Sequence, residues 1–279
     1  MSITLDGNLG ITTPMYNGAV SANQVTPSVS MKNRIINGAM VVDQRSAGAS
    51  TTVTTAGYYS CDRWYAQFSG ASKFAIQQNA GSVTPPAGFT NYIGCTSQAN
   101  TSVAATDYYC LNQIIEGYNV ADLAWGTSSA KSVTLSFWVR SSLTGTFGGS
   151  ITNSGYSRSY PFSYSIGSAN TWSQVSVTIP GDQSGTWLTS NGIGIDVIFG
   201  LGVGSTYSGT AGSWAATNYL STTGATSVVG TNGATFYITG VQLEKGSIAT
   251  PFDFRSYGTE LALCQRYYQT INSLVGTGS

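Results

Sequence analysis

The stretch from residue 236 to residue 268 constrains the fold more than any other part of the chain. It reads FYITGVQLEKGSIATPFDFRSYGTELALCQRYY, and its first residues alternate between two kinds of side chain. This alternation predicts a strand that ends at Gly246. One side of the strand is expected to carry Phe236, Ile238, Gly240 and Gln242, and the other Tyr237, Thr239, Val241 and Leu243.

A crossing segment and a short helix are expected after this strand. Pro251 holds the crossing segment extended, and Thr259 with Glu260 opens the helix. Within the helix, apolar residues recur at spacings of three and four, at Leu261, Cys264 and Tyr268. Strand, crossing segment and helix are expected to pack as one unit, because each would expose apolar surface alone.

Earlier segments of the chain have the length and apolar pattern of strands. We expect strands within residues 33–45, 58–68, 73–78, 92–98, 107–115, 131–142, 172–180 and 192–204. The first is interrupted by Asn37-Gly38, which indicates a bend. Trp64 is expected in the core, and a turn of helix at 119–124. The 279 residues therefore predict an all-β fold, an antiparallel β-sandwich that ends in a short helix.

Charge is sparse along the whole chain. Charged residues make up 8% of it, against about 25% in typical soluble domains, and the net charge is zero. Such a chain offers no basic footprint for nucleic acid or an anionic membrane. The N-terminal MSITLDGNLG lacks a basic region followed by an apolar stretch, and no apolar window reaches about 20 residues. We expect a soluble protein without a signal peptide, with no nucleic-acid partner and no membrane insertion.

The sequence lacks the usual means of catalysis. It has no histidine, which removes the commonest general base and most zinc sites. Its 11 acidic residues are scattered singly, whereas a glycan depolymerase needs two carboxylates about 5 to 10 Å apart. Acids that are distant in sequence can still converge in a fold. The pattern favours a non-enzymatic protein without catalytic residues.

The four cysteines are too widely spaced for a metal knuckle. They stand at Cys61, Cys95, Cys110 and Cys264. We expect them to be buried thiols that form no disulfide, and we expect no cofactor.

Several long motifs resemble structural proteins of tailed bacteriophages, usually described as tail-fibre, receptor-binding or virion-surface proteins. The C-terminal signature is GVQLEKGSIATPF followed by YGTELALCQRYY. In the same order as in that family come NRIINGAMVVDQR at 33–45, CDRWYAQ at 61–67, SVTLSFWVRSS at 132–142, TWSQVSVTIPGDQSGTW at 171–187 and GSWAATNYLSTTGA at 212–225. The resemblance covers roughly residues 30 to 270, and it names a class of protein rather than an activity.

A second resemblance is to the jelly rolls of carbohydrate-binding modules, carried by the middle motifs. It implies that the sandwich is a jelly roll. Jelly rolls often hold a structural calcium ion near the first and last strands, so Asp43 and Glu244 are the carboxylates to check for that alternative.

Residues 1–30 differ from the rest of the chain. They contain two prolines, one charged residue and only short apolar islands, too little to build a core. We expect an extended arm that attaches to a neighbouring subunit or to other virion proteins, as in β-augmentation. A disordered leader is the alternative. Residues 31–279 are expected to form the jelly-roll domain.

Two hypotheses for the function follow. The first is a tail-fibre or appendage component of the virion that binds host surface polysaccharide, stacking exposed aromatic rings on sugars. The glycan-binding candidates are Trp187, Tyr207, Trp214 and Tyr219; a role as loop anchors or interface residues is the alternative for each. The second hypothesis is a capsid decoration or cement protein, or a tail connector, with no receptor role. In either case the low charge and the arm favour a homo-oligomer, and the phage resemblance implies a trimer located in the virion.

Overall fold

The computed structural model describes residues 4–6, 10–12 and 31–270. The chain divides into two compact units, residues 1–31 and 32–279. In the first unit, β1 (Thr4–Asp6) pairs antiparallel with β2 (Gly10–Thr12). The other residues of the predicted arm lie outside the described residues, and its role in attachment stays a prediction.

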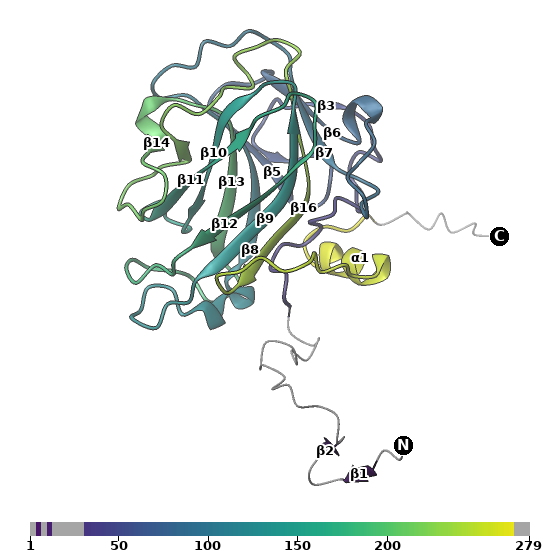
Figure 1. The fold of residues 1–279 in the computed structure, drawn as a ribbon. Helices are drawn as coiled ribbons and strands as arrows, with labels where there is room; N and C mark the ends of the chain where they lie inside the picture. Colours follow the sequence, from purple (N-terminus) through teal and green to yellow (C-terminus); the bar gives the residue numbers. More distant parts are fainter. Residues whose placement is uncertain (1–3, 7–9, 13–30, 271–279) are drawn as a thin grey trace, which may run out of the picture. The chain divides into compact units, whose positions relative to one another are not determined.

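The second unit contains two six-stranded sheets (Figure 1). The β13 sheet has the order β11 (Ser159–Ile166), β10 (Gly145–Thr152), β13 (Ile193–Val203), β8 (Tyr108–Glu116), β5 (Trp64–Phe68) and β4 (Gly57–Tyr58). The β16 sheet has the order β12 (Ser173–Ile179), β9 (Val133–Ser141), β16 (Thr235–Lys245), β7 (Ile93–Ser97), β6 (Phe74–Gln78) and β3 (Thr51–Thr52). All pairs within these two sheets are antiparallel.

The strand order defines the sandwich as a jelly roll. We count β7, β8, β9, β10, β11, β12, β13 and β16 as strands one to eight. The β16 sheet then contains the order 1-8-3-6, and the β13 sheet the order 2-7-4-5. Eight strands wound in this way form the two Greek keys of a jelly roll. The predicted fold class is confirmed.

The core lies between the two sheets and is rich in aromatic rings. Phe137 of β9 packs edge-on against Phe199 of β13 and against Tyr164 of β11, with ring centroids 5.1 Å apart in both pairs. Trp64 is buried there, as expected. The predicted turn of helix at 119–124 is present as two 3-10 turns, η2 (Gly117–Asn119) and η3 (Ala121–Leu123).

The prediction of which β16 residues share one side of the strand was wrong beyond residue 239. The pairing with β9 shifts register between Thr239 and Gln242, and Gly240 has a φ of 61°. A bulge with a left-handed glycine adds one residue to the strand and reverses which residues face the core. The fully buried inward residues are Phe236, Ile238, Val241 and Leu243, whereas Tyr237, Thr239, Gln242 and Glu244 lie on the outer side.

Residues 33–45 form no strand, contrary to expectation. Asn37 has a φ of 59°, and its side chain donates to the carbonyl oxygens of Val42 and Asp62 while accepting from the amide of Val42. These local hydrogen bonds replace a sheet ladder. The segment instead packs along β16, where the amide of Arg34 donates to the carbonyl of Leu243 at 2.9 Å.

The C-terminal helix is confirmed as α1 (Tyr257–Gln265), with the Ser256 hydroxyl accepting from the amide of Thr259 at its start. Before it, residues 246–256 form a strap along β16. Within α1, Glu260 is buried and accepts from the amide of Asn37 and from the Arg255 guanidinium at 3.3 Å. The helix therefore holds the strap and the segment after residue 32 together.

The segment at Gly38 approaches β16 too closely for a side chain. A Cβ at Gly38 would lie 2.1 Å from the carbonyl oxygen of Val241, a backbone atom of a central strand. We expect Gly38→Ala to lower the free energy of unfolding by about 1–3 kcal/mol. Gly167→Ala is the matched control, since a Cβ there meets nothing within 4 Å. Chemical denaturation measures both, and equal stability of the two variants would contradict this packing.

Candidate functional site

Two of the four candidate aromatic residues meet in a cluster of tryptophans. Trp187 and Trp214 pack edge-on against each other and against Trp125, with ring centroids 4.6–5.5 Å apart. Trp187 is only 8% exposed, so the expectation of an exposed ring at this position was wrong. Burial against two other indoles gives Trp187 a packing role, whereas Trp214 keeps part of its surface exposed.

Polar contacts fix the cluster in place. Arg158 donates two hydrogen bonds of 2.7 Å to the buried carboxylate of Asp182, which also accepts from the Trp187 indole at 3.3 Å. The Trp214 indole donates to the carbonyl of Pro180 at 2.8 Å. The Arg158 guanidinium lies 6.0 Å from the centroid of the Trp214 ring. Trp187 and Trp214 are therefore held by hydrogen bonds as well as by packing.

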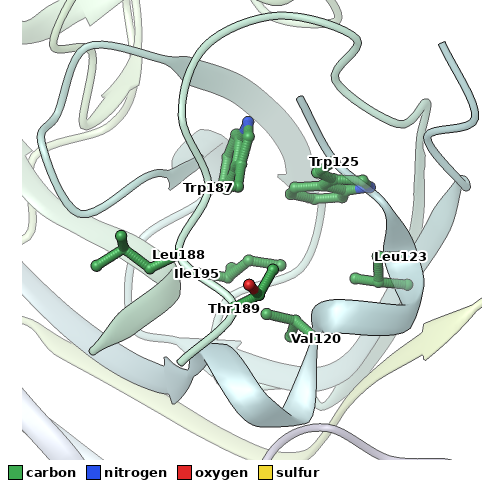
Figure 2. A pocket seen from close by; sticks show the side chains of 7 residues that line it. All are labelled: Val120, Leu123, Trp125, Trp187, Leu188, Thr189 and Ile195. Carbon is green, nitrogen blue, oxygen red and sulfur yellow. The ribbon is translucent and has the colours of Figure 1, made fainter. Parts of the chain in front are cut away.

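A small cavity lies beside the cluster (Figure 2). Its lining residues are Val120, Leu123, Trp125, Trp187, Leu188, Thr189 and Ile195. Its volume is about 10 Å³, which is room for a single water molecule. This cavity is too small for a sugar ring.

The other two candidates, Tyr207 and Tyr219, lie together on one loop. Residues 204–222, here called the covering loop, include the 3-10 turn η4 (Ser205–Tyr207) and the short parallel pair β14 (Ser208–Gly209) and β15 (Ser221–Thr222). Tyr207 packs edge-on against Tyr108 at 5.4 Å, and Tyr219 lies against Gly209. The amide of Leu220 donates to the carbonyl of Tyr207 at 2.8 Å. Both tyrosine rings remain partly exposed.

The covering loop lies against the outer face of the β13 sheet rather than standing free. A Cβ at Gly148 or Gly200 would lie 2.4 or 2.9 Å from the hydroxyl of Ser221, so glycines on β10 and β13 permit this approach. At the edge of the sheet, Ser159 forms a bridge with Ala215, and its hydroxyl accepts from the amide of Tyr219 at 3.3 Å. The sheet therefore sets the positions of Trp214 and Tyr219.

A buried polar group lies on the same outer face. Asp196 of β13 accepts from Asn112 at 3.0 Å and from the Tyr156 hydroxyl at 3.4 Å. Burial raises the pKa of Asp196 to about 7, although these hydrogen bonds act in the opposite direction. Five buried oxygens of this face have no hydrogen-bond partner among the described residues: Asp196 Oδ1, Asn112 Oδ1, Ser150 Oγ, Thr152 Oγ1 and Ser221 Oγ. No pattern in the sequence predicts this polar layer on the outer face of the sheet.

The candidate calcium ligands are occupied by protein donors. The Asp43 carboxylate accepts from the amides of Ser46 and Gly48, and that of Glu244 from the amide and hydroxyl of Thr250. Within the described ranges, no group of three or more potential ligands could hold a metal ion.

The four cysteines are buried and form no disulfide, as expected. No helix among the described residues is long and apolar enough to span a membrane.

Comparisons with known proteins give distant similarities in structure. No family model and no curated protein matches the chain. It is similar to the enzymatically active domain of tailspike protein 4 of bacteriophage CBA120, at 12% identity and a TM-score of 0.37 over 66% of this chain. The chain spans only 19% of that tailspike chain.

Two carbohydrate-binding modules are similar at the same level. A CBM4 structure has 13% identity and a TM-score of 0.38, covering 76% of this chain and 99% of the other. The family 11 module of a cellulosomal cellulase of Clostridium thermocellum has 13% identity and a TM-score of 0.33, covering 73% and 99%. Because these TM-scores lie below 0.5, the jelly-roll assignment rests on the strand order of the two sheets.

The raised pKa of Asp196 makes stability depend on pH. In the folded protein the carboxyl keeps its proton up to about pH 7, whereas in the unfolded chain it ionises near pH 4. The folded state binds more protons between these values, so stability falls as the pH rises from about 4 to 7. We expect Asp196→Asn to be more stable than the parent by roughly 2–4 kcal/mol at pH 8 and similar to it at pH 4.

Thermal unfolding followed by circular dichroism from pH 4 to pH 8 measures this difference. The parent and the variant should converge as the pH falls. Parallel curves, with a constant difference over the whole range, would show that Asp196 does not titrate in this way.

Proposed function

We propose that the chain is a non-enzymatic, glycan-binding component of a tailed-bacteriophage virion, carried on a tail fibre or similar appendage. One observation carries the proposal: Tyr207, Trp214 and Tyr219 keep partly exposed rings on a loop that is fixed to the β13 sheet. Aromatic rings combine an apolar face with a polar edge, which suits the faces and hydroxyls of a sugar. Loops positioned by a rigid scaffold commonly carry binding residues.

The polar groups around these rings also suit a carbohydrate. The covering loop exposes the hydroxyls of Ser205, Thr206, Thr210 and Ser213, and it contains no charged residue. Neutral donors and acceptors match the hydroxyls of a sugar without the cost of burying charge. The phage resemblance of the sequence motifs supports a role in the virion, with host surface polysaccharide as the ligand.

The remaining parts of the proposal concern activity and assembly. The absence of histidine and the scattered acids favour binding without hydrolysis. We propose a homo-oligomer, a trimer by the phage resemblance, with residues 1–30 attaching to other virion proteins.

A capsid decoration or connector protein is the second candidate. Large apolar side chains are exposed on the strap and at the start of α1, with Ile248 76%, Phe254 60% and Tyr257 59% exposed. Phe254 continues a cluster with Phe89 and Phe252. Exposed apolar side chains of this kind suit contact with another protein chain.

The glycan proposal predicts that Tyr219→Ala weakens binding to host cells and to their extracted surface polysaccharide. Loss of one stacking ring should reduce affinity roughly tenfold or more. Because the ring also packs against Gly209, the variant is expected to lose some stability, and circular dichroism at the assay temperature checks that it stays folded. Tyr118→Ala is the matched control, since Tyr118 is 62% exposed and lies outside the covering loop. Binding is measured by sedimentation with cells and by biolayer interferometry on immobilised polysaccharide.

Two results would count against the covering loop. Equal binding by the parent and Tyr219→Ala would place any glycan site elsewhere on the protein. No binding by a correctly folded parent would favour the decoration or connector role instead.

A further inference from the structure

A pocket of about 130 Å³ opens where three segments that are distant in sequence meet. Its lining comes from Arg45, from Tyr58, Asp62 and Arg63, and from Cys264, Tyr267 and Tyr268 after α1. The volume is close to the roughly 150 Å³ of a cavity that accepts a benzene ring. Six of the seven lining residues lie in the motifs NRIINGAMVVDQR, CDRWYAQ and YGTELALCQRYY, none of which the proposed glycan loop uses.

Two guanidinium groups are stacked on tyrosine rings at this pocket. Arg45 lies 3.5 Å from the centroid of Tyr268, and Arg63 lies 3.5 Å from that of Tyr267. Tyr58 is near both, at 5.5 and 6.0 Å. Stacking uses the flat face of a guanidinium and leaves its edge N–H groups for planar acceptors. The tyrosines therefore orient both cations.

Among the described residues, neither cation forms a salt bridge. Four of the seven arginines pair with carboxylates: Arg34, Arg158, Arg255 and Arg266. Of the other three, Arg45 and Arg63 line this one pocket. Arg63 is only 6% exposed and donates to the carbonyl of Ile114, and its buried Nε–H has no acceptor among the described residues. A buried guanidinium without a carboxylate partner is costly, so Arg63 contributes positive charge to the pocket wall.

The acidic groups nearby are already engaged. Asp62 accepts from the amide of Gln44 at 3.0 Å and from the Gln44 side chain. Glu116 accepts from Arg266 at 2.6 Å and from the Tyr267 hydroxyl at 2.6 Å. Asp62 also lines the pocket and offsets part of its positive charge, but among the described residues it forms no salt bridge with Arg45 or Arg63.

We propose that this pocket binds the carboxylate of an acidic sugar residue, with Arg45 and Arg63 donating to it. The proposal rests on glycan binding as the proposed function and adds a second site on the same chain. Arginine forms paired, charge-assisted hydrogen bonds with planar carboxylates. The surrounding tyrosine rings provide an apolar wall for the sugar.

Calorimetric titration of the full chain with galacturonate, galactose and inorganic sulfate at constant ionic strength tests the pocket. The parent should bind galacturonate, with galactose and sulfate weaker by roughly tenfold or more. Arg45→Gln should lose this preference, and because Arg45 is exposed the variant is expected to fold. Arg140→Gln is the matched control. Arg140 also forms no salt bridge among the described residues, but it lies beside Tyr237 and does not line the pocket. This variant should bind galacturonate as the parent does.

Three results would overturn the assignment. These are equal binding of galacturonate and galactose by the parent, equal binding of sulfate and galacturonate, and unchanged galacturonate binding by Arg45→Gln. The polysaccharide assay with Tyr219→Ala separates the two sites. Polysaccharide binding that depends on Tyr219 but not on Arg45, without galacturonate binding, would reject the pocket and leave the proposed function standing.

Discussion

The structure depends on two buried polar side chains on the outer side of a central strand. Gln242 and Glu244 of β16 are 0% and 3% exposed, so their polar atoms need partners within the protein. Residues 246–256 supply these partners: Thr250 donates to Glu244, and the amide of Asp253 donates to Gln242 at 2.8 Å. This requirement fixes the strap, and the strap in turn places Arg255 and α1. The same β16 backbone accepts from Asn33 at 3.1 Å, so both ends of the folded unit are anchored on one strand.

Sequence patterns predicted the strands well because side-chain alternation is a local property. The strands β8, β9, β12, β13 and β16 and the helix α1 lie where they were expected. The errors have a common cause in contacts between distant residues. At the bulge in β16, the amide of Val241 donates to the carbonyl of Gly38. At the bend, Asn37 donates to the carbonyl of Asp62 and to the carboxylate of Glu260. A strand pattern at 33–45 cannot reveal that the hydrogen bonds of this segment are made by its own Asn37 side chain and by groups of distant segments.

The candidate site was predictable only in part for the same reason. A long polar loop with aromatic residues indicates a presented surface, and Tyr207, Trp214 and Tyr219 are indeed partly exposed on it. The burial of Trp187 depends on Trp125, which belongs to the segment after η3 and carries no sequence signal for this contact. The pocket at Arg45 and Arg63 could not be predicted from the sequence either, because Tyr267 and Tyr268 come from the other end of the chain. Because this protein has few charged residues, its local positive charge depends on where two arginines lie close together.

We propose that this chain binds host surface polysaccharide without cleaving it. The most direct measurement is incubation of the purified protein with that polysaccharide, followed by size-exclusion chromatography with light scattering over time. We expect the protein to elute with the polymer and the molar mass of the polymer to stay constant. Protein that elutes separately from intact polysaccharide, or a polymer that becomes progressively shorter, would contradict it.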